Sequence, residues 1–147
     1  MKAGSEKDVP LEIILGVGVA IRRDGCYLFG LRCSPLGFGT LGFPGGHLEP
    51  GEDPFACAAR ELFEETRLHL ANARAEGWFS HVDGPQRFLT LYVAGDVDGI
   101  AQVREPTKCA GWQWLPYDEC PGPLFAPPAG YFASVASVAS KPRTTSA

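Results

Sequence analysis

Three glutamates are spaced so that a helix would bring their carboxylates together. Glu61, Glu64 and Glu65 stand at positions i, i+3 and i+4, which a helix places within an arc of about 100° on one side. Like charges at this spacing repel by about 0.2–0.5 kcal/mol per pair, and the sequence puts no basic residue on the same face. Several carboxylate oxygens in one place suit a hard divalent cation such as Mg²⁺ or Mn²⁺. We therefore expect a metal ion to bind on this face.

The residues before these glutamates favour a metal site over a plain acidic helix surface, the ordinary interpretation of an isolated acidic triplet. The run from Gly45 to Leu68 reads GGHLEPGEDPFACAARELFEETRL and resembles the Nudix box, G-x5-E-x7-R-E-U-x-E-E-x-G-U, in which U is aliphatic. Eight residues match fixed positions of the box: Gly46, Glu52, Arg60, Glu61, Leu62, Glu64, Glu65 and Leu68. A match of this length is far more specific than a lone glycine-rich loop.

The resemblance implies roles for the charged residues of the box. Three glutamates would hold one or more Mg²⁺ ions or act as the general base, with a backbone carbonyl as a further ligand: Glu61, Glu64 and Glu65, with Gly45 or Gly46. Members of the family differ in which glutamate is the base, and our first choice is Glu61. Glu52 and Arg60 would pair across the junction between the loop and the helix, where they hold the two segments in position.

One fixed position of the box departs from the pattern, because Arg67 stands where the box has glycine. Glycine there would permit a left-handed residue at the end of the helix, but such φ angles are uncommon outside Gly, Asn and Asp. We therefore expect the helix to run past Arg67 or to end in a cap that is not of the glycine type.

A looser likeness to the MutT-related nucleotide triphosphate diphosphatases extends over residues 14–126. It is strongest to the subgroup that hydrolyses thiopurine nucleotides, in which the same box glycine is also replaced. This likeness implies that Arg32, Thr90 and Phe125 bind substrate, and His47 is a further candidate for a phosphate contact. Other interpretations stay open: Arg32 and His47 as plain loop residues, Thr90 as an ordinary strand residue and Phe125 as a core aromatic.

These residues together predict an enzyme that acts on nucleotides. Cleaving a phosphoanhydride requires charge neutralisation and a positioned water, which carboxylate-held cations provide. A chain with a formal net charge of −4 can bind a polyanion only where a metal reverses the sign locally. The resemblance implies Mg²⁺-dependent hydrolysis of nucleoside triphosphates, including modified or deoxy purine nucleotides such as 8-oxo-dGTP, to a nucleoside monophosphate and pyrophosphate, as in sanitation of the nucleotide pool. Alternatives are hydrolysis of dinucleoside polyphosphates, ADP-ribose or NADH, and a non-catalytic nucleotide-binding sensor.

Local patterns predict the elements that position these residues. Apolar and β-branched runs flank Arg23-Asp24-Gly25 and indicate a hairpin, while Asp53-Pro54 is typical of a helix start. The helix should reach about Arg67, with a core-facing stripe of Phe55, Ala59, Leu62 and Thr66. Further elements are expected as a loop with at most short strands at 34–50, strands at 75–81, 86–97 and 111–115, and a weak helix at 131–139. We predict an α/β fold, a Nudix-type α/β/α sandwich with a mixed central sheet and one catalytic loop-helix.

The chain as a whole has the size and composition of one folded domain. Its 147 residues are 45% hydrophobic and 20% charged, as in globular proteins. We expect a flexible tail at 1–10, a single Nudix domain at 11–133 and a helix end or tail at 134–147.

Composition also bears on location and partners. No apolar run approaches the length of about 20 residues that a membrane-spanning helix needs, the amino terminus does not read as a secretory signal, and five cysteines without a CxxC pair favour reduced thiols. We expect a cytoplasmic protein whose partner is a nucleotide. The acidic balance and the absence of a basic stripe argue against a nucleic acid polymer, no membrane partner is expected, and a homodimer stays open.

Overall fold

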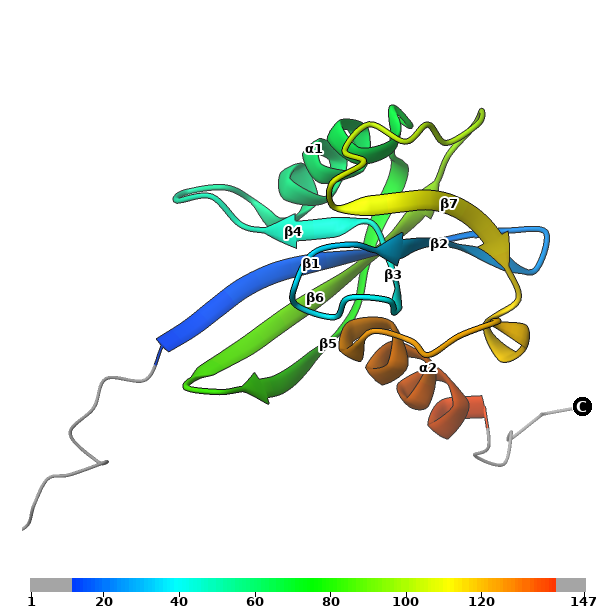
Figure 1. Cartoon of the computed structure of the whole chain (residues 1–147). Coiled ribbons are helices and arrows are strands. Elements are labelled where there is room, and N and C mark those ends of the chain that lie inside the picture. The colour runs from blue at the N-terminus through cyan, green and yellow to red at the C-terminus, as the bar shows by residue number, and fades with distance from the viewer. Residues whose placement is uncertain (1–11, 140–147) are drawn as a thin grey trace, which may run out of the picture.

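The computed structural model describes residues 12–139 of the chain (Figure 1). The predicted tail at 1–10 and the end of the chain from 140 onward lie outside the described residues. The elements follow in the order β1 (Glu12–Arg23), β2 (Cys26–Arg32), β3 (Leu41–Gly42), β4 (Gly45–His47), α1 (Pro54–Thr66), β5 (Ala71–Asp83), β6 (Gln86–Asp96), β7 (Cys109–Leu115), a short 3-10 helix (Tyr117–Glu119) and α2 (Ala126–Ala139).

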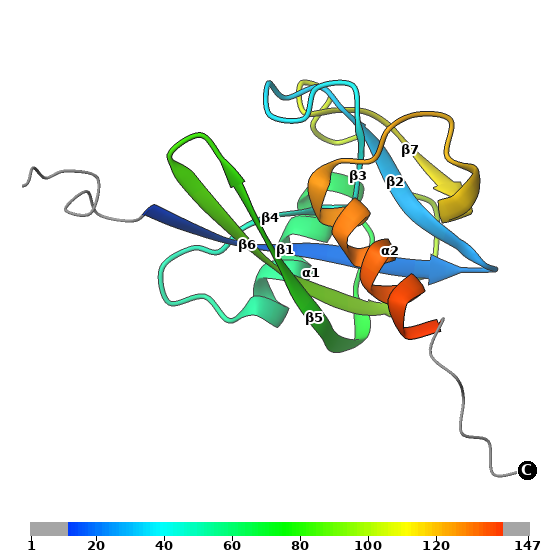
Figure 2. The same cartoon turned by 90° about the horizontal axis from the view of Figure 1, so that it is seen from below.

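A mixed sheet forms the centre of the molecule. Its strands run in the order β3-β2-β1-β6-β5, with β4 paired to β1 and β7 paired to β2. Only β1 and β6 are parallel among these pairs, and the others are antiparallel. Helix α1 lies on one side of the sheet and α2 on the other, as the two views show (Figures 1 and 2). The prediction of an α/β/α sandwich with a mixed sheet is confirmed.

Two apolar cores hold the helices to the sheet. Under α1, Leu62 packs with Val19 and Val93 of the sheet in one buried cluster. Under α2, Tyr131 and Phe132 pack with aromatic residues of the sheet and the loop before β4, in a second cluster. None of the helices within residues 12–139 has the length and hydropathy needed to cross a lipid bilayer.

The predicted turn and helix start are confirmed. Asp24 and Gly25 join β1 to β2 with φ angles of 52° and 81°, the positive values that a two-residue hairpin turn requires. Asp53 caps α1 by accepting hydrogen bonds from the N–H groups of Phe55 at 2.6 Å and Ala56 at 3.4 Å. Pro54 takes the first helical position, where its missing N–H leaves no unmet hydrogen bond.

The predicted core stripe of α1 is only half right. Leu62 and Thr66 are fully buried as expected, but Phe55 is 41% exposed and the other buried positions are Cys57 and Ala58. One cause is strand β4, whose last residue lies against this helix: the Cys57 thiol is 3.6 Å from the carbonyl oxygen of His47. The end of β4 covers a face that a helix wheel alone assigns to solvent.

The prediction for Arg67 is wrong. The residue caps α1 with φ 67° and ψ 10°, in the left-handed region, and its N–H donates to Phe63 O at 2.9 Å. The residues on either side impose this turn, because both Thr66 and Leu68 are buried. The Thr66 hydroxyl also accepts a hydrogen bond from the Leu68 N–H at 3.0 Å. Arginine therefore adopts the conformation that glycine would adopt more easily.

Two predicted elements are longer than the sequence indicated. β5 begins at Ala71 rather than 75, and α2 begins at Ala126 rather than 131. The first eight residues of β5 are all exposed, so they carry no alternating apolar pattern, and their pairing with β6 defines them as a strand. Pro127 and Pro128 lie in the first turn of α2, where proline is tolerated.

Candidate functional site

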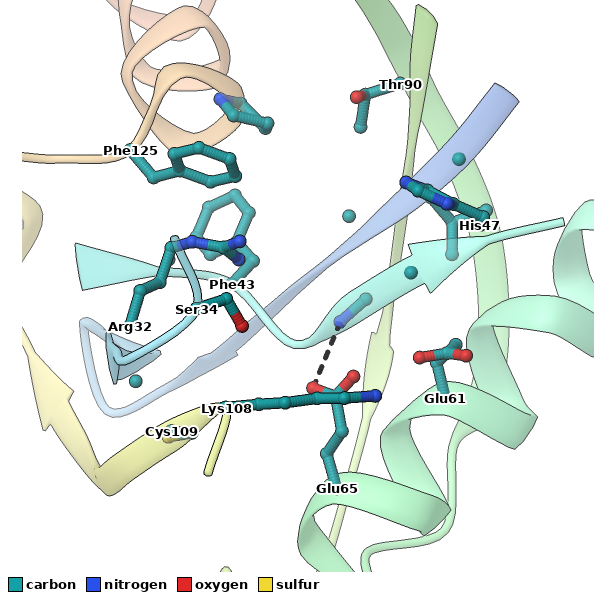
Figure 3. Close-up of a pocket in the computed structure, with 18 of the residues that line it drawn as sticks. Arg32, Ser34, Phe43, His47, Glu61, Glu65, Thr90, Lys108, Cys109 and Phe125 are labelled. Atoms are coloured by element: carbon teal, nitrogen blue, oxygen red, sulfur yellow. Dashed lines mark hydrogen bonds between the residues drawn. The ribbon is translucent and has the colours of Figure 1, made fainter. Parts of the chain in front are cut away.

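A cavity of about 590 Å³ opens between α1, β4 and the loop after it, β6, the start of β7 and the start of α2 (Figure 3). Most of the residues singled out from the sequence line it: Arg32, Gly45, Gly46, His47, Arg60, Glu61, Glu65, Thr90 and Phe125. Glu52 and Glu64 do not belong to the lining. Residues as far apart in the sequence as Arg32 and Phe125 thus meet in one pocket.

Two carboxylates form the acidic wall of the pocket. Glu61 and Glu65 lie one helical turn apart on α1 and point into the cavity (Figure 3). Burial and the neighbouring carboxylate of Glu61 raise the pKa of Glu65 to about 9. The Gly45 N–H also faces Glu65 Oε1, at 3.4 Å. Two acidic groups that cannot both ionise without a counter-charge are a suitable site for a divalent cation.

The absence of a side chain at Gly46 allows this arrangement. A Cβ atom placed on Gly46 would collide with the carboxylate of Glu61. The backbone of β4 and the carboxylate therefore approach each other more closely than any other residue would permit, so that Glu61 and the peptide groups of β4 can face the same ligand.

Arg60 binds the carboxylates of three glutamates of the box. Its Nε and Nη2 donate to the two oxygens of Glu52 at 2.7 and 2.9 Å, a bidentate pair across the loop-to-helix junction. This ion pair lowers the pKa of Glu52 to about 2. Arg60 Nη1 also donates to Glu61 Oε1 at 2.8 Å and to Glu64 Oε1 at 3.2 Å. The expectation that no basic group relieves the acidic face is wrong, because the long Arg60 side chain crosses to it.

The three glutamates are not equivalent. The Glu64 side chain is 47% exposed and bonds to Arg60 outside the cavity. Within residues 12–139, no group of three His, Cys, Asp or Glu side chains is arranged to hold a metal ion. The residues present nevertheless fit Mg²⁺, which commonly takes one or two protein carboxylates and completes its coordination with water and substrate phosphate. Glu61 and Glu65 would supply those carboxylates.

Arg32 lies on the opposite wall in a fixed position. Its guanidinium stacks on the ring of Phe125 at 3.9 Å from the ring centre, and its Nε donates to Leu36 O at 3.0 Å. Burial lowers the pKa of Arg32, partly offset by the attraction of Glu65, but a guanidinium remains charged in proteins. The pocket therefore has a permanent positive charge facing its acidic wall.

The end of the pocket near α2 is apolar. It is formed by Phe125, Pro127 and Pro128 together with the 8% exposed Thr90, and the Arg32 guanidinium covers the Phe125 ring. Neither proline has an N–H group, so the start of α2 lacks most of the donors with which a helix amino terminus binds anions. The carbonyl of Pro127 instead accepts a hydrogen bond from Tyr92 Oη at 2.7 Å. This end suits a flat apolar group rather than a phosphate.

Sequence reasoning missed several lining residues. Phe43 and Phe88 come from strands or loops with no motif of their own, and Glu105 and Lys108 come from the segment before β7. The spacing of Glu105 and Lys108 was the one available signal, since charges three residues apart can pair in a turn. Lys108 Nζ lies 3.6 Å from Glu105 Oε1.

Comparison with known proteins gives consistent matches. The NUDIX domain family matches residues 14–134. An RNA pyrophosphohydrolase of Rhizobium meliloti (strain 1021) is 31% identical, covering 80% of this chain and 86% of that protein. The NAD-capped RNA hydrolase NudC of Edwardsiella ictaluri is 35% identical over 78% of this chain, but the match spans only 42% of that protein.

Solved structures share the fold. A MutT NUDIX hydrolase from Burkholderia pseudomallei superposes with a TM-score of 0.76 at 27% identity, covering 83% of this chain and 95% of that one. A MutT protein from Methanosarcina mazei Go1 superposes with a TM-score of 0.79 at 20% identity, covering 91% of this chain and all of that one (100%).

Proposed function

Because this chain belongs to the NUDIX family and is a phosphoanhydride pyrophosphohydrolase, we propose that its substrates are nucleoside triphosphates, which it converts to a nucleoside monophosphate and pyrophosphate. We further propose that modified or deoxy purine nucleotides, such as 8-oxo-dGTP or thiopurine nucleotides, are among them. This is the role of an enzyme that removes unwanted nucleotides from the cellular pool.

The observation that carries the proposal is the polarity of one small pocket. Its acidic wall at Glu61 and Glu65 suits metal-bound phosphates, and its apolar end at Phe125 and Pro128 suits a nucleobase. A volume of about 590 Å³ is in the range of pockets that enclose one ligand of moderate size. A mononucleotide would therefore lie with its phosphates toward α1 and its base toward α2.

The chemistry would be metal-assisted hydrolysis at a phosphoanhydride. Bound Mg²⁺ or Mn²⁺ supplies charge neutralisation and lowers the pKa of water. Glu61 and Glu65 would hold the cation, and one of the glutamates, with Glu61 as first choice, would also accept the proton of the attacking water. The water oxygen bonds to a phosphorus of the α–β bridge, and the bridging P–O bond breaks to give the two products. Arg60 holds Glu61 in place, and Arg32, stacked on Phe125 just before α2, would contact the substrate at the end proposed for the base.

Cytoplasmic location and pool sanitation remain parts of this proposal. All five cysteines are free in the structure, in keeping with a reducing compartment. A second candidate is removal of phosphate from the 5′ end of RNA, which the similarity to the Rhizobium RNA pyrophosphohydrolase favours. The net charge of −4 weighs against a long polyanionic partner.

A substrate panel tests the proposal. The values of kcat/KM should be measured with Mg²⁺ for dGTP, 8-oxo-dGTP, a thiopurine triphosphate, ADP-ribose, NADH, a diadenosine polyphosphate and 5′-triphosphorylated RNA. We expect the purine triphosphates to be hydrolysed most efficiently, because the pocket has one apolar end. ADP-ribose, NADH or RNA as the best substrate would refute the proposed specificity. Binding of nucleotides without any turnover would identify the protein as a sensor.

A further inference from the structure

Lys108 stands out among the lining residues because the hydrolytic account does not use it. Three side chains of the lining carry a positive charge, namely Arg32, Arg60 and Lys108, and all lie within the described residues. Arg60 is engaged by Glu52 and Glu61, and Arg32 is fixed between Phe125 and a backbone carbonyl. Lys108 is therefore the lining cation at the Glu65 end of the pocket that no strong partner engages.

The backbone of Lys108 is held firmly while its tip is exposed. Its carbonyl accepts a hydrogen bond from the Cys33 N–H at 2.8 Å, which joins the residue to the end of β2, and its own N–H donates to Glu105 O at 2.9 Å. The side chain is 65% exposed, and the distance of 3.6 Å to Glu105 makes a weak ion pair. Lys108 can therefore exchange Glu105 for a phosphate at small cost.

The position of Lys108 indicates which part of a nucleotide it would meet. Figure 3 shows Lys108 on the side of the pocket away from Thr90, at the end where Glu65 lies. With the base at the apolar end and the reacting phosphorus at the glutamates, the next group along the substrate is the leaving pyrophosphate. Its charge develops as the bridging bond breaks, and an ammonium group placed there stabilises it.

We propose that Lys108 is a substrate-binding residue that contacts the β- and γ-phosphates and so favours triphosphates over shorter nucleotides. This assignment rests on the proposed function, because it takes pyrophosphate to be the leaving group. Lys108 acts as a compact point charge with three donors, so arginine should replace it in part.

Binding of the two products provides the test. The dissociation constants of pyrophosphate and of dGMP should be measured by calorimetry in Mg²⁺ for the wild type, Lys108→Met and Lys108→Arg. Arg104→Met is the matched control, because it removes one positive charge from an exposed position of the same segment that does not line the pocket. We expect Lys108→Met to weaken pyrophosphate binding about 10- to 100-fold, the scale for a lost charge-assisted hydrogen bond. The same variant should change dGMP binding less than twofold. Lys108→Arg should retain most of the affinity for pyrophosphate.

The kinetic counterpart uses the same variants. Lys108→Met should lower kcat/KM for dGTP more than for dGDP. Equal pyrophosphate affinity in Lys108→Met and Arg104→Met, or an equal loss for pyrophosphate and dGMP, would overturn the assignment. Product binding needs no turnover, so it tests the Lys108 assignment separately from the proposed function. If Lys108→Met weakens pyrophosphate binding but the enzyme prefers another substrate, only the proposed function is refuted.

Discussion

Replacing Arg67, the left-handed cap of α1, tests how strongly the buried neighbours impose its conformation. For a residue with a Cβ atom the left-handed conformation costs about 1–2 kcal/mol. Glycine avoids that cost but gives up about 0.4–1 kcal/mol through the greater freedom of the unfolded chain. Changing alanine to glycine at this position should therefore raise the free energy of unfolding by about 0.8 kcal/mol.

The arginine side chain makes a separate contribution. Its guanidinium lies 4.7 Å from the centre of the Phe63 ring, a cation–π contact that contributes about 0.5–1 kcal/mol at an exposed site. We expect Arg67→Ala to lose that amount, because alanine keeps the strained backbone without the contact. Arg67→Gly should recover the loss and unfold at or slightly above the urea concentration of the wild type.

The free energy of unfolding of both variants can be measured by urea denaturation, provided that its dependence on urea concentration has the same slope in each. Ala59→Gly is the matched control, because it introduces glycine inside α1, where the helical φ gives no relief and the expected loss is about 1 kcal/mol. If Arg67→Gly is no more stable than Arg67→Ala, the left-handed conformation of this residue is not a source of strain, and the explanation of the cap is refuted.

Three further predictions concern the site and the core. Glu65→Gln should lower turnover by at least about 10²-fold with the melting temperature kept, whereas Glu64→Gln should lower it less, because Glu64 lies outside the pocket; equal losses would contradict the unequal roles. Gly46→Ala should lower kcat by at least about tenfold, since its Cβ would displace the Glu61 carboxylate, and full activity in this variant would show that the close approach is unnecessary. Cys57 should be the slowest cysteine to react with iodoacetamide in peptide mapping, because it is fully buried and burial raises the pKa of its thiol to about 12; rapid labelling of the folded protein would contradict this.

The parts of the fold that sequence could predict depend on local signals. Asp53 and Pro54 predict a helix start, because the N–H groups of the first helical turn need a capping acceptor and proline there removes one of them. Asp24-Gly25 predicts a hairpin, because both residues tolerate the positive φ angles of a two-residue turn. The pocket residues Glu61 and Glu65 could be predicted from the sequence, because their spacing alone puts them on one helix face.

The parts that escaped depend on contacts between distant segments. The backbone of Arg67 is left-handed because Thr66 and Leu68 are both buried, and residue propensities carry no information about that constraint. The acidic face is relieved by Arg60 because its side chain is long enough to reach the carboxylates from a neighbouring position. Lys108 reaches the pocket only because its backbone pairs with the end of β2, 75 residues earlier at Cys33, and such a pairing has no local signature.

The central claim is that a cation held by Glu61 and Glu65 hydrolyses nucleoside triphosphates between the α- and β-phosphates. Phosphorus NMR of the enzyme with dGTP, recorded during turnover with Mg²⁺ and again with EDTA, tests it most directly. We predict resonances of dGMP and pyrophosphate in equal amounts with Mg²⁺, no early orthophosphate, and no hydrolysis in EDTA. Orthophosphate and dGDP as the first products, or an undiminished rate in EDTA, would contradict the claim.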